Sequence, residues 1–341
     1  GAFAVRATML DPVGGVSHVR VVHPTAALAT EPGVSARVDM RFETDLPDGI
    51  PKIAVLHRPA LTSDTWRAAL GGLLAAGWVI VVEFDDNPEF FQRMAGDGEA
   101  TFRAAHAVQT STPELAEVLR RRNPEVAVFP NAVAELPPIR NFVDTDGVTV
   151  FFGALNREQD WRPIIEAVNR VAAAAGPRLR FKVMHDHAFF EALQTPSKEF
   201  LPLGDYVTYL GALGGCEISL MPLEDNGFNR AKSDLKFVEA GACRVAPLAS
   251  RVVYGATARD GDTAMLFSDA AEFETKFRRL VAMPEIAARI AGSARDYVAR
   301  ERMLAYQVAP RLAWYRSLWE RRAALTEALR VRMETPFDPR S

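Results

Sequence analysis

A short segment in the second half of the chain has the residue types that bind a nucleotide. Lys232, Lys236 and Glu239 lie close together, and Lys236 and Glu239, three residues apart, would share one face of a helix. A helix N-terminus carries unpaired N–H groups and partial positive charge, so it attracts a diphosphate, and two lysines would strengthen that attraction. The carboxylate would accept hydrogen bonds from ribose hydroxyls. The alternative is an ordinary amphipathic helix with a solvated Lys–Glu pair.

The helix that would position these residues is expected between two short strands. Residues 218–221 and 245–249 are apolar runs of strand length, and residues 235–242 carry an apolar stripe of helical period. Ser233 precedes this stripe and is a good N-cap, because its hydroxyl can accept from a backbone N–H one turn in. The segment therefore predicts a strand, a helix and a second strand.

Two strand ends in the first half of the chain also carry polar side chains. His57 follows the apolar run 53–56, and Glu83, Asp85 and Asp86 follow the run 78–82. Because the carboxyl ends of strands border the binding crevice of an open α/β sheet, both positions suit chemistry. The histidine could instead merely end its strand. The acids would either bind a hard cation or place one carboxylate at an acceptor hydroxyl.

Two further loops are candidates for ligand contact. Gly14 and Gly15 follow a weak first strand at residues 2–10, and glycines there let the backbone approach a ligand closely, although paired glycines are also common in plain turns. His185 opens a His-Asp-His loop after the strand expected at residues 180–184. Such a short trio gives poor geometry for a metal, so His185 either contacts the ligand's base or sugar or is simply a polar loop residue.

Composition excludes several classes of protein. The chain has 341 residues, 48% of them hydrophobic, and a net charge of −3, which suits two ordinary domains. The Lys and Arg residues are spread along the chain, so no nucleic-acid groove or polybasic membrane anchor is expected. The two cysteines, Cys216 and Cys243, form neither a metal motif nor a disulfide framework. With no apolar run of membrane-spanning length and no secretory signal, we expect a cytoplasmic protein, or part of a larger cytoplasmic polypeptide.

Strands alternate with helices in two successive sets, which predicts two doubly wound, Rossmann-like α/β domains facing a cleft. A polar, Pro-rich linker follows residue 135. We place the first domain at residues 1–140, with a C-terminal helix at about 306–335, and the second at residues 147–305. The aromatic residues of the last helix, taken as one helix over about 303–333, indicate that it packs against another surface.

The central segment resembles the donor site of GT-B glycosyltransferases, close to family 4. Residues 233–240 read SDLKFVEA and residues 244–250 read RVAPLAS; GVSHVR at 15–20, His-x-Pro at 57–59 and DGDTAMLF at 260–267 extend the resemblance over nearly the whole chain. It implies the GT-B fold, with the C-terminal helix crossing back to the first domain.

The same resemblance implies roles for individual residues. Glu239 would hold the ribose, His57 would face the donor sugar, and Gly14 and Gly15 would line the cleft. The helix start, with Lys232, Ser233 and Lys236, would stabilise the departing diphosphate. Because enzymes of this fold generally work without a bound metal, we favour Asp85 as an acceptor-side carboxylate and expect no metal site.

The sequence departs from the family pattern at the phosphate and sugar contacts. The first glutamate of the family's E-x7-E pair falls at Ala231, so its contact is either absent or made by a neighbour. Ala154 and Gln159 stand where the family has a basic pair, which leaves Arg157 as the substitute. Three polar residues precede Ala231 and could replace the glutamate: Asp225, Asn226 and Asn229.

The expected activity is transfer of a hexose from a nucleotide sugar to a hydroxyl acceptor, with retention implied by the family and a role in bacterial surface glycans. The base stays open among UDP, GDP and dTDP, and no other cofactor is expected. The acceptor would be a glycan, a lipid-linked sugar or a protein, with at most peripheral membrane contact. The alternative is a degenerate, non-catalytic domain that binds glycan or protein. A dinucleotide oxidoreductase fits less well, because no G-x-G-x-x-G follows a strand.

Overall fold

A computed structural model describes residues 2–9, 15–39, 42, 46–47, 49–90, 94, 98–139 and 146–337. The chain divides into two compact units. Unit 1 consists of residues 1–134, 231–233 and 304–341, and unit 2 of residues 135–230 and 234–303. The short segment 231–233, which the sequence places in the second domain, thus belongs to unit 1.

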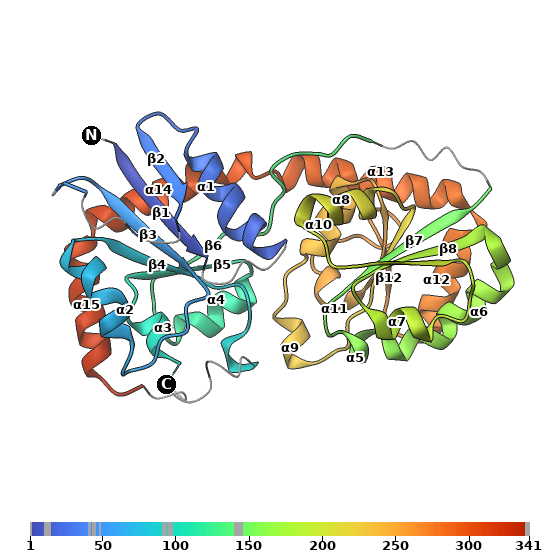
Figure 1. The fold of residues 1–341 in the computed structure, drawn as a ribbon, viewed down its shortest axis with the longest axis horizontal. Coiled ribbons are helices and arrows are strands. Elements are labelled where there is room, and N and C mark those ends of the chain that lie inside the picture. Colours follow the sequence, from blue (N-terminus) through green and yellow to red (C-terminus); the bar gives the residue numbers. More distant parts are fainter. Residues whose placement is uncertain are drawn as a thin grey trace. The chain divides into compact units, whose positions relative to one another are not determined.

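Unit 1 is built on a parallel sheet of six strands in the order β2-β1-β3-β4-β5-β6 (Figure 1). The register places His57 at the end of one strand opposite Glu83 at the end of the next. The central strands are apolar and buried, as expected of a parallel sheet that is covered on both faces. The strands are β1 Phe3–Met9, β2 Val34–Val38, β3 Lys52–His57, β4 Val79–Glu83, β5 Ala107–Thr110 and β6 Val126–Val128.

Helices from both ends of the chain cover this sheet. Of the last two, α14 supplies Leu312 and Tyr315, and α15 supplies Leu325, to the same core as Val5 and Val55. The chain therefore returns to the first unit as predicted, but in two helices rather than one, because the first ends at Arg321. The helices are η1 His18–Val22, α1 His23–Leu28, α2 Trp66–Ala75, η2 Pro88–Phe90, α3 Ala100–Arg103, α4 Pro113–Arg120, α14 Ala305–Glu320 and α15 Arg322–Glu334.

Unit 2 contains a second parallel sheet of six strands, in the order β12-β11-β10-β7-β8-β9, of which Figure 1 labels β7, β8 and β12. Its strands are β7 Val148–Gly153, β8 Leu179–Met184, β9 Lys198–Leu201, β10 Ile218–Met221, β11 Ala246–Ser250 and β12 Met265–Phe267. Its helices are α5 Glu158–Trp161, η4 Arg162–Ile164, α6 Ile165–Ala175, η5 Gly176–Arg178, α7 His187–Ala192, α8 Tyr206–Gly214, α9 Gly227–Arg230, α10 Leu235–Ala242, α11 Arg251–Tyr254, α12 Ala270–Ala282 and α13 Pro284–Glu301. The predicted α/β class, with two doubly wound sheets, is confirmed.

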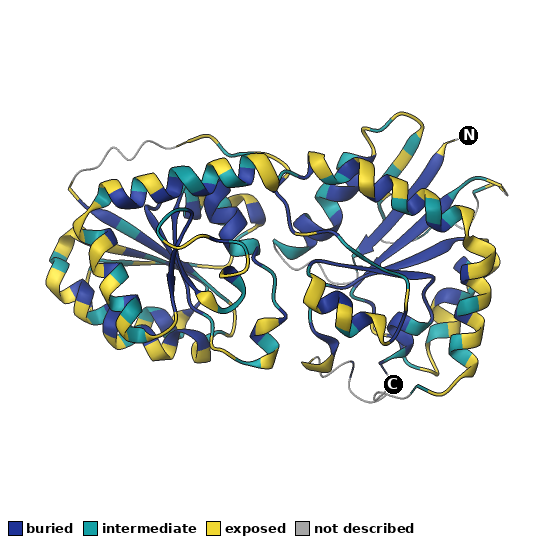
Figure 2. Ribbon diagram, turned by 180° about the vertical axis from the view of Figure 1, so that it is seen from behind, coloured by how far each residue is buried: buried dark blue, intermediate teal, exposed yellow. Residues whose placement is uncertain are grey.

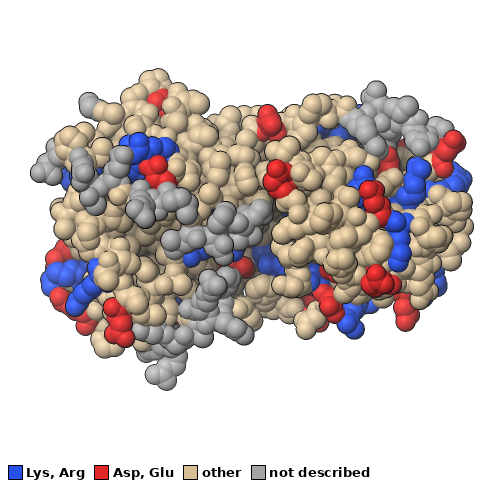
Figure 3. Space-filling view, viewed as in Figure 1, with Lys and Arg blue, Asp and Glu red and all other residues tan. Residues whose placement is uncertain are grey.

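Burial follows the amphipathic patterns of the sequence. Figure 2 shows buried strands at the centre of each unit and helices with one buried and one exposed side. The exposed helix faces carry ion pairs such as Arg162 with Glu158 and Arg170 with Glu274, and Figure 3 shows the two signs of charge interspersed. Among the described residues, no helix has both the length and the apolar character that a membrane span requires.

Helix α10 packs closely on α13 at Gly241, and this contact gives a first prediction. A Cβ at Gly241 would lie 2.8 Å from Val298 Cγ2 and 3.0 Å from the Ala294 carbonyl oxygen. We expect Gly241→Ala to lower the free energy of unfolding by about 1–3 kcal/mol, because the two helices must move apart. Urea unfolding followed by circular dichroism measures the change.

The control is Gly292→Ala on α13, where a Cβ would meet nothing within 4 Å. Alanine there should stabilise the helix by up to about 1 kcal/mol, because glycine is a poor helix former. Equal effects of the two substitutions would contradict the close contact at Gly241.

Candidate functional site

The start of helix α10 differs from the sequence prediction. Its N-cap is Asp234, and the prediction that Ser233 caps the helix is wrong. The Ser233 hydroxyl instead accepts a hydrogen bond from Asn131 Nδ2 at 2.7 Å, within unit 1. The Asp234 carboxylate accepts from Arg302 at 2.6 and 2.7 Å and from the Thr257 hydroxyl at 2.9 Å, so it does not cap the helix either. The first turn of α10 therefore has no capping side chain at its N-cap position.

The two lysines of the central segment lie in different units. Lys236, in the first turn of α10, donates from Nζ to the carbonyl oxygen of Gly153 at the carboxyl end of β7. Lys232 belongs to unit 1, where its Nζ lies 3.7 Å from Asp86 Oδ1. Lys236 alone thus adds its positive charge to the first turn of α10 within unit 2.

Glu239 is buried inside unit 2 beneath two tyrosines. Glu239 as a whole is only 3% exposed, and its Oε2 accepts a hydrogen bond from the Tyr209 hydroxyl at 3.0 Å. Burial raises the pKa of Glu239 to about 7, although hydrogen bonds from Tyr206 and Tyr209 and the charge of Lys236 oppose the rise. The pKa of both tyrosines is raised, first by burial and then by the Glu239 carboxylate. Protonated tyrosines therefore donate to a carboxyl group that titrates near neutral pH.

The sequence interpretation did not identify Tyr206 and Tyr209. They lie three residues apart on α8, so they share one face of the helix. The ring of Tyr209 also packs edge-on against Phe151 of β7, with centroids 5.7 Å apart. The spacing of the two tyrosines in the sequence could have indicated that they share a helix face. No residue near them in the sequence indicated that this face lies against Glu239.

Arg157 is held by a buried polar cluster in the loops after β7 and β10. Its Nη1 donates to Asn229 Oδ1 at 3.1 Å and lies 3.4 Å from Asp160 Oδ2. Asn229 is 2% exposed and donates from Nδ2 to Asp160 Oδ1 at 2.7 Å and to the Glu224 carbonyl at 2.9 Å. The amide of Asn229 is thus used within the protein and orients the guanidinium. These loops line a cavity of about 710 Å³.

The other residues considered as replacements for the missing glutamate lie nearby. Asp225 is exposed and bonds Arg230 at 2.6 Å. Asn226 is partly exposed, and its Oδ1 accepts from the Asn229 backbone at 2.8 Å. Ala231 itself is buried in unit 1.

His185 lies at the carboxyl end of β8 and has a left-handed backbone, with φ of 71°. Its backbone N–H donates to the Leu201 carbonyl at 2.9 Å. The neighbouring Asp186 caps α7 by accepting from Phe189 N at 2.8 Å, and it also accepts from Trp161 Nε1 at 3.2 Å. Asp186 therefore has a structural role, and His185 is the residue of this loop that directly follows the carboxyl end of β8.

In unit 1, the ends of β3 and β4 bring His57 and Asp85 together. His57 Nε2 lies 3.7 Å from Asp85 Oδ1, beyond hydrogen-bond length, and Arg58 Nε donates to the same oxygen at 2.7 Å. Burial would raise the pKa of Asp85, but the charge of Arg58, its hydrogen bond and the nearby His57 outweigh burial and hold the pKa well below its usual range. Arg58 has a left-handed backbone, with φ of 48°. Asp85 is thus a firmly ionised group beside a buried histidine.

The three acidic residues at the end of β4, Glu83, Asp85 and Asp86, do not form one cluster of carboxylates. Glu83 is fully buried and accepts from Arg20 at 2.8 and 3.1 Å, so it belongs to the core. Asp86 lies 3.8 Å from Arg58 Nη2 and near Lys232. Among the residues that the structure describes, no cluster of three His, Cys, Asp or Glu side chains suits a metal ion.

The glycine loop is described only in part. Gly14 lies outside the described residues. Gly15 has a φ of 81°, in the left-handed region that glycine favours, and its carbonyl accepts from Val19 N at 3.0 Å. This residue therefore makes the turn into the first helix of unit 1.

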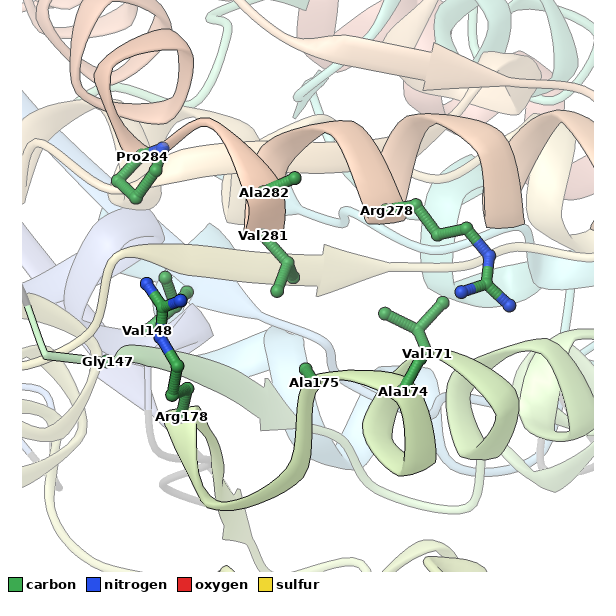
Figure 4. Close-up of a pocket in the computed structure, with 10 residues that line it drawn as sticks. All are labelled: Gly147, Val148, Val171, Ala174, Ala175, Arg178, Arg278, Val281, Ala282 and Pro284. Carbon is green, nitrogen blue, oxygen red and sulfur yellow. The ribbon is translucent and has the colours of Figure 1, made fainter.

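A second cavity of unit 2 lies at the amino end of β7, the opposite end of this strand from Gly153. It measures about 420 Å³ and is lined by the start of β7 and the ends of α6 and α12. Figure 4 shows Arg178 and Arg278 at opposite sides of this cavity, with Val171 and Val281 between them. Ligands of doubly wound sheets bind at the carboxyl ends of the strands, where Lys236 and His185 lie, so this cavity is separate from the candidate site.

Comparison with known proteins finds similarity at the level of structure. The sequence matches no described protein family and no curated protein. Anabaena HepE in complex with UDP-glucose superposes with a TM-score of 0.60 at 12% identity, covering 91% of this chain and 99% of HepE. Sucrose-phosphate synthase of Thermosynechococcus elongatus gives 0.62 at 15% identity, covering 93% and 99%.

A glycosyltransferase of Rickettsia africae also gives a TM-score of 0.62, at 10% identity, and covers 93% of this chain and 98% of its own. Identities this low bear on the fold alone, so closeness to family 4 stays a prediction. Over more than nine tenths of its length, the chain has the GT-B fold of these solved glycosyltransferases.

Proposed function

We propose that this protein transfers a sugar from a nucleotide sugar to a hydroxyl acceptor, and that Glu239 holds the ribose of the donor. The observation that carries the proposal is a buried carboxylate one turn behind the cationic start of α10. The Tyr209 hydroxyl already donates to this carboxylate, so it marks where a ribose hydroxyl would donate. A ribose contact and a phosphate contact would then come from one helix.

The diphosphate would be bound by the first turn of α10, by Lys236 and by Arg157. The turn has no side-chain cap from Asp234, and its partial positive charge would stabilise the negative charge that develops on the leaving group. Asn229 and Asp160 hold the guanidinium of Arg157 in place. The adjoining cavity, about 710 Å³, falls within the range of small-molecule sites. His185 is proposed as a further donor contact.

In unit 1, His57 is proposed to contact the donor sugar and Asp85 to meet the acceptor hydroxyl. An ionised Asp85 can accept a hydrogen bond from a hydroxyl, and it lies beside the buried imidazole of His57. Lys232 and Ser233 would assist the phosphates only after leaving Asp86 and Asn131, their present partners. Gly14 and Gly15 are proposed to approach the ligand through their backbone.

The finer assignment rests on the family resemblance. It favours a hexose donor, retention at the anomeric carbon, a role in bacterial surface glycans, and no resident metal or cofactor. Because the solved HepE structure contains UDP-glucose, UDP sugars are the first donors to test. The competing function is a non-catalytic binding module, which Ala231 in place of a glutamate would suit.

Nucleotide binding tests the proposal. Thermal unfolding of the full chain is measured against UDP, GDP, dTDP and UDP-glucose, and one base should raise the midpoint in a saturable way. Glu239→Gln should raise the Kd for that nucleotide by about tenfold, because a charged hydrogen-bond acceptor is replaced by a neutral one. Release of UDP in the presence of candidate acceptors then measures transfer.

Glu217→Gln is the matched control. Glu217 lies in unit 2 immediately before β10, where its Oε2 accepts from Thr149 N at 2.6 Å, so the same change there should leave nucleotide affinity unaltered. A folded protein whose midpoint responds to none of the nucleotides would contradict the transferase and favour the binding module.

A further inference from the structure

Unit 1 contains a cavity at the edge of its sheet opposite His57. It measures about 470 Å³ and lies at the amino ends of β3 and β4, against α14 and α15. Lys52 begins β3 and His57 ends it, so at a rise of about 3.3 Å per residue the two ends of the strand are well separated. The polar and aromatic lining residues are Lys52, Trp78, His106, Trp319, Arg322 and Thr326.

Lys52 is the unusual member of this lining. It is only 2% exposed, and its side chain makes no hydrogen bond or ion pair with any residue that the structure describes. A lysine side chain that is mostly withdrawn from water favours an anionic partner, because removing water from a charge is costly. A negative ligand in the adjoining cavity would remove this cost.

The other polar groups of the cavity are mostly donors. The indole nitrogen of Trp78 is buried and has no partner among the described residues. Ile80 N donates to His106 Nδ1 at 2.9 Å, so the proton of the neutral ring is on Nε2, which donates to Thr326 Oγ1 at 3.0 Å. Burial, followed by the charge of Arg332, lowers the pKa of His106 to about 4, which keeps the ring neutral.

The charges around the cavity point the same way. Arg322 lies over the ring of Trp319, at 4.3 Å from its centroid, and donates one bond to the Trp319 carbonyl at 3.0 Å. The acid of the lining, Glu327, is exposed and takes two hydrogen bonds from Arg330, at 2.6 and 3.0 Å. Its charge is therefore already balanced, so among the described lining residues Lys52 and Arg322 carry the net positive charge.

We propose that this cavity binds a phosphate group, either as free phosphate or on a small sugar phosphate. Lys52 would form the ion pair from the sheet, and Arg322 would reach the ligand from the start of α15. Lysine and arginine are the usual phosphate ligands in proteins, and a bound phosphate would join β3 to the C-terminal helices of the same unit. The cavity shares no lining residue with those proposed to bind the nucleotide sugar, and within unit 1 it lies at the opposite end of β3 from His57.

The test is thermal unfolding against inorganic phosphate and against glucose 6-phosphate, at ionic strength held constant with NaCl. We expect a saturable rise of the midpoint in the wild type. Lys52→Met keeps the apolar stem but removes the charge, and it should weaken the apparent Kd for phosphate at least about tenfold. Tighter binding of glucose 6-phosphate than of phosphate would identify an ester as the ligand.

Lys182→Met is the matched control, because Lys182 is a half-buried strand lysine in unit 2, on β8. In Lys182→Met, phosphate should raise the unfolding midpoint as much as it does in the wild type. In Lys52→Met, the rise of the midpoint caused by the nucleotide should be unchanged. If Lys52→Met does not fold, Arg322→Gln, at an exposed position, should show the weakened phosphate binding. An unchanged Kd in the folded variants, or a wild-type midpoint that follows ionic strength alone, would overturn the proposal.

Discussion

Glu83→Ala should lower the free energy of unfolding of this protein by about 3–5 kcal/mol. The carboxylate is fully buried and accepts two hydrogen bonds from Arg20, at 2.8 and 3.1 Å, and one from Gln109 at 2.7 Å. Removing it leaves the Arg20 guanidinium buried without a counter-charge, and breaking a buried pair in this way is costly. Urea unfolding at neutral pH measures the loss.

The loss should spread through the network around Arg20. Arg20 Nη1 also donates to the Phe129 carbonyl at 2.6 Å and to Asn131 Oδ1 at 3.1 Å, and the Tyr315 hydroxyl donates to Gln109 at 2.8 Å. Loss of Glu83 therefore loosens the contact between β5 and α14 as well as the end of β4.

An exposed ion pair of the same unit provides the control. Arg321 Nη1 donates to Glu125 Oε2 at 2.8 Å, but the Arg321 side chain is 46% exposed. Arg321→Ala should cost less than about 1 kcal/mol, because water screens such a pair. Similar losses for Glu83→Ala and Arg321→Ala would show that burial of the Arg20 pair does not matter.

The strands of this fold are largely predictable from sequence. Parallel strands buried on both faces read as short apolar runs, and the runs before His57 and around Ile218 became β3 and β10. The two sets of alternating strands and helices gave the correct α/β class. The break between α14 and α15 was missed, because Arg321, where the first helix ends, carries no helix-breaking signal.

The errors at the site come from partners that are distant in sequence. Ser233 fits the local rule for an N-cap, but its hydroxyl is taken by Asn131, 102 residues away. Asp234 could have capped instead, yet it is held by Arg302, 68 residues away. Glu83 was grouped with Asp85 and Asp86 by position, whereas its pairing with Arg20 depends on packing. Local patterns locate the site, and tertiary contacts decide what each polar group does.

Glu239 gives the second large expected effect, a fall in stability as pH rises. Its pKa in the folded chain is about 7, against an ordinary value of 4.5, so the folded state holds the proton more tightly than the unfolded state. This contribution is fully present below about pH 4.5 and is lost as the pH rises through about 7. A difference of about 2.5 pKa units corresponds to about 3 kcal/mol.

The measurement compares the wild type with Glu239→Gln across this range. The free energy of unfolding of the wild type should fall by about 3 kcal/mol relative to the variant between pH 4.5 and 8, because glutamine does not titrate. Glu217→Gln, at another buried glutamate of unit 2, should follow the wild type. A constant difference between the wild type and Glu239→Gln would contradict a raised pKa at Glu239.

Nucleotide affinity should change with pH in the opposite direction. Ribose hydroxyls donate hydrogen bonds, and an ionised carboxylate accepts them better than a protonated one, so affinity should increase as the pH rises through about 7. The ionised Glu239 lowers the free energy of unfolding of the ligand-free protein at neutral pH. Hydrogen bonds from the ribose of the nucleotide sugar would then stabilise this carboxylate. If affinity is independent of pH in the wild type and in Glu239→Gln alike, Glu239 does not contact the ribose, and the site must bind its ligand through Arg157 and the start of α10 alone.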